Sequence, residues 1–229
     1  MAYYIIHCCE SRLWYVKDFL IPSMVAQGIK RENILLYRDK NRIGNLRAFI
    51  DSCNGLLNLC NKKGDIEGVW HLQDDVVISK SFKTRTERYD KGLVCGFTCA
   101  YDDNPKEGIF TIADRELWFS FPCIRIPTDL LREFITWANT NLWQSTYFRE
   151  WVLRNKGDDL VFKEWLFNHP AKQDMLYLNL APNLVNHIDD LIGGTVANKQ
   201  RDTEFNTRSM FWNEEDVISD LEEQLKNHR

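Results

Sequence analysis

Two adjacent carboxylates, Asp74 and Asp75, interrupt an apolar run that starts at Val69 and resumes at Val76. Carboxylates beside buried strands are costly, because an anion taken out of water needs a cation or hydrogen bonds to compensate it. A carboxylate pair at the C-terminal end of a strand therefore predicts a bound divalent cation, and oxygen ligands suit Mg²⁺ or Mn²⁺. The alternative for an isolated Asp pair is a solvated turn.

Five alternating segments would place this pair at the edge of a sheet. The apolar periodicity predicts strands over 3–8, 33–37 and 69–72, with helices over 11–28 and 46–60 between them. Strand, helix, strand, helix, strand is the order typical of a parallel α/β sheet. Such sheets bind ligands in the crevice at the C-terminal ends of their strands.

The second half of the chain has a less regular pattern. It predicts strands over 92–98, 116–121 and 123–126, and helices over 128–139, 158–167 and 213–226. A polar stretch precedes the last helix, so we expect one domain over 1–198, followed by a polar connection and an amphipathic helix over 199–229. This helix should dock on the body of the protein, with homodimerisation as the alternative.

The chain has 229 residues, and its content of 44% hydrophobic and 27% charged residues is typical of a soluble globular protein. No apolar run reaches the roughly 20 residues of a membrane helix, and the N-terminus lacks the features of a signal peptide. The seven cysteines form no CxxC pair or disulfide framework. We interpret them as reduced thiols rather than a zinc site, and expect a cytoplasmic protein.

The charge pattern argues against a general nucleic-acid-binding surface, since the net charge is −4. One local basic cluster follows the Asp pair and consists of Lys80, Lys83, Arg85 and Arg88. Such a cluster is usually a solvated loop. Beside a metal site it could instead hold phosphates.

With these elements in place, the chain resembles the glycosyltransferases of the A-type (GT-A) fold over about residues 3–190. Four places carry the resemblance: Arg12 with 20–24 after the first strand, the acidic segment 72–76, the second acidic motif 157–162, and the late segment 181–188. The resemblance implies an α/β, GT-A-like single domain with a mixed, mostly parallel central sheet flanked by helices. One departure is that Gln73 stands where the Asp-x-Asp motif has its first acid.

The family implies transfer of a sugar, hexosyl or related, from a nucleoside-diphosphate sugar to an acceptor hydroxyl, with Mn²⁺ or Mg²⁺ bound. By this resemblance Asp75 is the principal metal ligand, and Asp74 is a second ligand or a contact to the nucleotide ribose. His187 would complete the metal shell or touch the diphosphate. Asp159, or else Asp158, would be the general base of an inverting transfer.

The nucleotide should lie over the ends of the first strands. Candidates to bind it are His7 and Arg12 after the first strand, Asp39 after the second, and Arg42 with Gly44 before the next helix. Glycine permits close backbone approach, and a helix N-terminus favours phosphate.

The acceptor and the reaction class leave alternatives open. The acceptor could be a saccharide, a protein or a modified nucleic-acid base. Most of the aromatic residues between 118 and 165 should be core, but one or two, such as Trp143 and Tyr147, could form an acceptor platform. The rival functions are a metal-dependent nucleotidyl or phosphoryl transferase and a non-catalytic nucleotide-sugar-binding protein.

Overall fold

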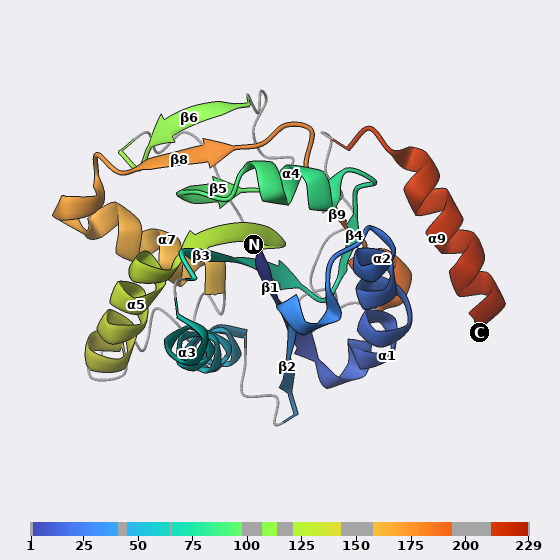
Figure 1. Ribbon diagram of the computed structural model, residues 1–229, viewed down its shortest axis with the longest axis horizontal. Helices are drawn as coiled ribbons and strands as arrows, with labels where there is room; N and C mark the ends of the chain where they lie inside the picture. Colours follow the sequence, from blue (N-terminus) through green and yellow to red (C-terminus); the bar gives the residue numbers. More distant parts are fainter. Residues whose placement is uncertain are drawn as a thin grey trace.

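The computed structural model describes residues 2–40, 45–64, 66–97, 107–113, 121–142, 158–193 and 212–228. Within these ranges the chain forms a seven-stranded sheet with helices on both faces (Figure 1). The strand order is β2-β1-β3-β7-β5-β8-β6. A separate two-stranded sheet lies beside it and pairs β4 with β9.

The strands of the large sheet are β1 (Tyr3–Cys9), β2 (Ile34–Asp39), β3 (Gly68–Gln73), β5 (Leu93–Cys95), β6 (Gly108–Thr111), β7 (Cys123–Pro127) and β8 (Leu176–Asn179). The small sheet consists of β4 (Val76–Ile78) and β9 (Val185–His187), which run antiparallel. In the large sheet only β7 and β6 run against the other five strands. The predicted mixed, mostly parallel sheet is confirmed.

The described α-helices are α1 (Leu13–Tyr15), α2 (Ile21–Ala26), α3 (Asn45–Lys63), α4 (Phe82–Arg88), α5 (Thr128–Trp137), α7 (Asp158–Asn168), α8 (Asp189–Ile192) and α9 (Glu215–His228). Between them lie the 3₁₀ turns η1 (Glu10–Arg12), η3 (Arg31–Asn33) and η5 (Pro170–Lys172), and the π-helical segments η2 (Val16–Leu20) and η4 (Ala138–Leu142). The predicted helix over 11–28 is therefore a chain of four short helical segments. Pro22, which has no N–H to donate, lies at the start of α2, where π geometry changes to α.

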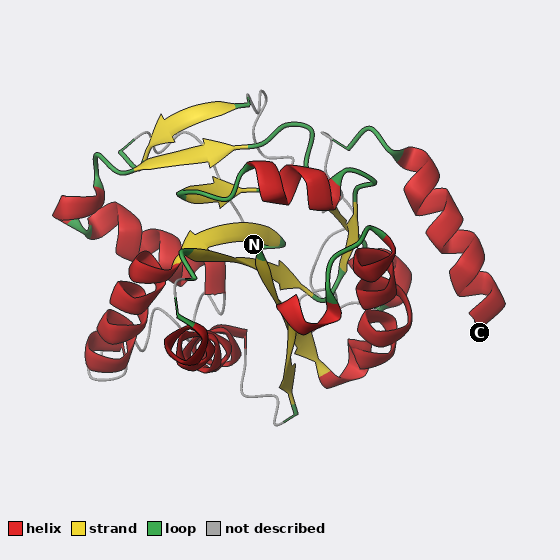
Figure 2. Cartoon of the chain, in the orientation of Figure 1, coloured by secondary structure: helices red, strands yellow, loops and turns green. Residues whose placement is uncertain are grey.

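Side chains that alternate along the strands build two apolar cores, one on each face of the sheet. On β1, Tyr4 and Ile6 face the core covered by α1, α2, α4 and α9, whereas Ile5 faces the core covered by α3, α5 and α7. On β3, Trp70 faces the first of these cores and Val69 faces the second. Figure 2 shows the resulting layers, with the sheet between two sets of helices. The central strands are buried on both faces, which explains their nearly continuous apolar sequence.

The C-terminal helix docks on the body, as predicted. Ile218, Leu221 and Leu225 of α9 are buried in the core that also contains α1 and α2. The His228 ring stacks on Trp14, with 5.7 Å between the ring centroids. Lys80 forms an ion pair with Asp216 of the same helix. His228 Nε2 also lies 3.7 Å from Asp18 Oδ2, so the docking combines apolar burial with polar contacts at both ends of α9.

Three residues of the basic cluster, Lys83, Arg85 and Arg88, lie in a helix and not in a loop, contrary to our prediction, whereas Lys80 lies in the exposed turn before it. Residues 82–88 form α4, which buries Phe82 and Thr86 against the sheet. Lys83 pairs with Glu87 one turn later, at 2.6 Å. The cluster is thus partly neutralised by acidic neighbours.

Other sequence expectations meet the structure in part. The predicted strands at 92–98 and 123–126 correspond to β5 and β7, whereas 116–120 and the polar stretch 199–207 lie outside the described residues. The cysteines that the structure describes are all free thiols: Cys8, Cys9, Cys53, Cys60, Cys95 and Cys123. Within the described ranges, no helix has the length and apolar character needed to cross a membrane.

Candidate functional site

The acidic pair follows β3 at the end of the sheet where β1 and β2 also finish. His7 of β1 lies opposite Gln73 of β3, and Cys9 lies opposite Asp39 of β2. The three parallel strands therefore bring their C-terminal ends together, and the turn with Asp74 follows directly. This is the edge at which α/β sheets bind ligands.

Asp74 is held by the end of β1. Its Oδ2 accepts a hydrogen bond from the Cys9 backbone N–H at 2.7 Å, and its Oδ1 accepts one from Arg12 Nη1 at 2.8 Å. The residue is 5% exposed. Both carboxylate oxygens thus have a partner, one from the last residue of β1 and one from the last residue of η1.

Asp75 lies between two basic side chains. Its Oδ2 is 2.5 Å from Arg12 Nη1 and 3.1 Å from His187 Nε2. The same Arg12 nitrogen therefore bridges both carboxylates of the motif. Arg12 also donates from Nε to the Gly193 carbonyl at 3.0 Å, and it is 2% exposed. This is a buried ion cluster, with charge-assisted hydrogen bonds in place of water.

His187 reaches this cluster through the small sheet. It pairs with Val76 in the β4–β9 ladder, and the Ile188 N–H donates to the Asp75 carbonyl at 2.9 Å. On its other side, His187 Nδ1 is 3.4 Å from Asp189 Oδ1. Both ring nitrogens therefore face carboxylates, an arrangement that suits the doubly protonated imidazolium.

The two charges support each other electrostatically. Burial would raise the pKa of Asp75, but His187 and Arg12 outweigh burial and hold that pKa well below its usual range. Burial would lower the pKa of His187, but Asp75 and Asp189 outweigh burial and raise the pKa above its usual 6.5. Both groups are thus favoured in their charged forms.

The raised pKa of His187 predicts a pH-dependent contribution to stability. This contribution is fully present below the unfolded-state pKa of about 6.5 and is lost as the pH rises through the higher folded-state pKa. Urea unfolding of the wild type and of His187→Gln should therefore differ more in free energy at about pH 6 than at about pH 9. A difference that stays constant over this range would show that His187 is not held as an imidazolium.

The donor set does not fit a divalent cation as it is arranged. Within the described ranges, no group of three or more His, Cys, Asp or Glu side chains could hold a metal ion. Three of the four oxygens of the Asp pair already accept hydrogen bonds, and Asp75 Oδ1 alone is buried without a partner. The Mn²⁺ or Mg²⁺ expected from the sequence stays a prediction.

The other predicted nucleotide-binding residues lie around this cluster. His7 is half-buried on β1, with its ring 5.9 Å from Tyr37 and 6.1 Å from His71. Burial lowers the pKa of His7, which favours the neutral ring. Asp39 is the buried last residue of β2. Their predicted role in nucleotide binding remains a prediction.

Two groups of predicted residues are only partly placed by the structure. Arg42 and Gly44 lie outside the described residues. Asp158 and Asp159 are the first two residues of α7, but their side chains lie outside the described part of the molecule. The assignment of Asp159 or Asp158 as a general base therefore stays a prediction.

Two members of the cluster were not predicted from the sequence. Asp189 is the first residue of α8, and its carboxylate faces the ring of His187. The sequence signal for this contact was the spacing, since Asp189 lies only two residues after His187. The Gly193 carbonyl accepts a hydrogen bond from Arg12 Nε. This contact could not be predicted from the residue type, because every residue has a backbone carbonyl. The structure also shows that Arg12 contacts the carboxylates, which the sequence did not indicate.

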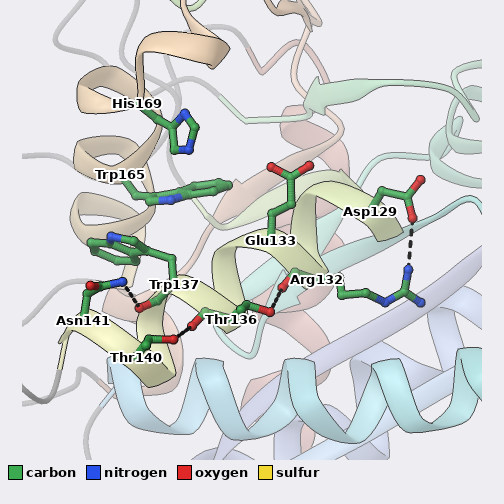
Figure 3. A pocket seen from close by; sticks show the side chains of 9 residues that line it. All are labelled: Asp129, Arg132, Glu133, Thr136, Trp137, Thr140, Asn141, Trp165 and His169. Carbon is green, nitrogen blue, oxygen red and sulfur yellow. Dashed lines mark hydrogen bonds and ion pairs between the residues drawn. The ribbon is translucent and has the colours of Figure 1, made fainter.

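A separate groove of about 580 Å³ lies between α5 with η4 and α7 (Figure 3). Its lining residues are Asp129, Arg132, Glu133, Thr136, Trp137, Thr140, Asn141, Trp165 and His169. The groove is on the α5–α7 side of the molecule, away from β4 and β9 in Figure 1. It is therefore not part of the ion cluster. Trp165 is almost fully buried, whereas Trp143 and Tyr147, the predicted acceptor platform, lie outside the described residues.

Comparison with known proteins adds no family assignment. No protein-family model matches the sequence, and no curated protein sequence matches it. Among solved structures, A197 from STIV covers 82% of this chain and 86% of its own, at 12% identity and a TM-score of 0.45. A glycosyltransferase involved in the glycosylation of the major capsid of PBCV-1 covers 80% and 83%, at 11% identity and a TM-score of 0.40.

A third similar structure is the galactosyltransferase LgtC in complex with donor and acceptor sugar analogs. It covers 96% of this chain and 95% of its own, at 13% identity and a TM-score of 0.41. Because all three TM-scores are below 0.5 and the identities are 13% or less, these similarities carry no functional argument.

Proposed function

We propose that this chain is a glycosyltransferase that moves a sugar from a nucleoside-diphosphate sugar to an acceptor hydroxyl. The observation that supports the proposal is the 3.1 Å contact between Asp75 and His187. These residues belong to two motifs far apart in the sequence, each of which resembles a site motif of GT-A glycosyltransferases. They meet at the end of β1 and β3, where a nucleotide would approach an α/β sheet.

The reaction creates negative charge that the site must tolerate. The acceptor oxygen forms a bond to the anomeric carbon while the bond from that carbon to the diphosphate breaks, and the electron pair leaves with the nucleoside diphosphate. Arg12 and protonated His187 offset two of the three carboxylates of Asp74, Asp75 and Asp189, so the cluster repels an anionic donor less than the acidic pair alone would. Preorganised positive groups of this kind stabilise charge that develops on a leaving group.

The acceptor proton needs a base in an inverting transfer. We assign this role to Asp159, with Asp158 as the alternative, on the resemblance of residues 157–162 to the second acidic motif. Turnover of a nucleotide sugar by Asp159→Asn should fall by a factor of about 10² to 10⁴. Asp158→Asn is the matched control, and an effect confined to this control would exchange the two roles.

Ligand-induced thermal stabilisation tests the proposal directly. We would measure melting temperatures with a panel of nucleoside diphosphates, their sugars and nucleoside triphosphates, with and without Mn²⁺. One nucleotide should raise the melting temperature by several degrees, and Asp75→Asn should lose most of this rise relative to its own ligand-free state. Asp174→Asn, which changes an exposed aspartate just before β8, is the control variant and should keep it.

The rival functions give different results in the same measurements. Stabilisation by a triphosphate, with its turnover, would favour nucleotidyl or phosphoryl transfer. Stabilisation by a nucleotide sugar without any turnover, unaffected by Asp159→Asn, would favour a non-catalytic binding protein. If no nucleotide stabilises the chain, the proposed site does not bind a nucleotide sugar and the proposal fails.

A further inference from the structure

The hydrogen bonds around the acidic pair leave little room for a metal ion. Asp74 uses Oδ2 for the Cys9 N–H and Oδ1 for Arg12, and Asp75 uses Oδ2 for Arg12 and His187. His187 turns its second nitrogen to Asp189. Of the four oxygens of the Asp pair, Asp75 Oδ1 is the one without a partner, whereas Mg²⁺ and Mn²⁺ need several oxygen or nitrogen ligands.

Arg12 already lies where a bridging cation would be needed. Its Nη1 is 2.8 Å from Asp74 Oδ1 and 2.5 Å from Asp75 Oδ2, so one positive nitrogen contacts both carboxylates. A divalent ion that bridged the same two oxygens would compete for this position. It would also lie against a guanidinium that keeps its charge at any ordinary pH.

Arg12 is not a surface side chain that can swing away freely. It belongs to η1, directly after β1, and its Nε donates to the Gly193 carbonyl. At 2% exposure it would have to leave a buried position. Displacement would therefore leave several polar groups unpaired, which is unfavourable.

We infer that Arg12 is the resident cation of the acidic motif and that it excludes a divalent metal ion from Asp74 and Asp75. Arg12 then supplies the positive charge that pairs with Asp74 and Asp75, and donor binding at this edge does not depend on Mn²⁺ or Mg²⁺. This inference extends the proposed function, and its consequence for catalysis rests on that function. The cation contacts themselves can be tested without any nucleotide.

Binding of Mn²⁺ alone is the decisive measurement. Free Mn²⁺ can be followed by its electron paramagnetic resonance signal during titration of the full chain. The wild type should show no Asp75-dependent binding, whereas Arg12→Gln should gain an Asp75-dependent site that binds Mn²⁺ about tenfold or more above any residual binding by the wild type. This gain should disappear in Arg12→Gln combined with Asp75→Asn, and Asp174→Asn should behave like the wild type.

Arg12→Lys separates the charge from a merely structural role. Lysine keeps a positive charge between the carboxylates, so this variant should not gain a Mn²⁺ site. The inference is overturned if the wild type binds Mn²⁺ in an Asp75-dependent way, or if a folded Arg12→Gln gains no affinity. Asp75-dependent binding of Mn²⁺ by the wild type would overturn the inference even if Arg12→Gln does not fold. Failure of the nucleotide panel would instead contradict the proposed function and leave the Mn²⁺ result intact.

Discussion

Replacing Asp75 with asparagine should lower the free energy of unfolding by about 3–5 kcal/mol near neutral pH. The substitution keeps the size of the side chain but removes the charge that Arg12 and His187 both contact, at 2.5 and 3.1 Å. Breaking a buried ion pair from one side leaves the partner charge uncompensated in a medium that solvates it poorly. Urea-induced unfolding followed by circular dichroism measures this loss.

The sign of the pH dependence gives a second check on the same variant. Because the folded-state pKa of Asp75 is lowered, its contribution is present above the unfolded value of about 3.8 and is lost as the pH falls through the folded-state pKa. The difference between wild type and Asp75→Asn should therefore shrink on strong acidification. Asp174→Asn should change the free energy of unfolding by only about 0.5 kcal/mol or less. Equal losses in Asp75→Asn and Asp174→Asn would contradict the buried ion cluster.

Much of the fold could be predicted where one pattern extends over many residues. The period of about 3.6 residues in 46–60 marks α3, and the two-sided apolar run at 69–72 marks β3, because burial on one stripe or on both faces leaves a distinct pattern. The three-residue strands β4 and β9 leave no such pattern. Their pairing joins distant segments, and it is this pairing that sets His187 beside Asp75.

The site was predictable in its residue types but not in its contacts. Asp74 and Asp75 could be chosen because carboxylates rarely follow buried strands without a polar task. His187 was chosen on the resemblance of residues 181–188 to a late segment of GT-A glycosyltransferases. Arg12 was also chosen, but as a group for the nucleotide. Its contact with both carboxylates depends on how η1 leaves β1 and on the carbonyl of Gly193, neither of which is encoded in a local spacing.

Removal of the Phe134 ring should cost about 3–5 kcal/mol of unfolding free energy. Phe134 is fully buried on α5, and its ring centroid lies 5.0 Å from that of Phe162 and 5.3 Å from that of Trp165. Phe134→Ala would remove one member of an aromatic cluster that joins α3, α5 and α7, and the surrounding rings can collapse only in part.

The matched control is Phe110→Ala, on the edge strand β6, where the ring is only half-buried. We expect a clearly smaller loss there, because less apolar area leaves water at that position and the edge can relax. Urea unfolding of both variants compares the two sites. If Phe134→Ala lowered the free energy of unfolding no more than Phe110→Ala does, the aromatic residues between α5 and α7 would not form a close-packed core. Such a result would favour a ligand-binding role for these aromatic residues. A larger loss at Phe134 would show that these rings are close-packed and contribute to the stability of the fold.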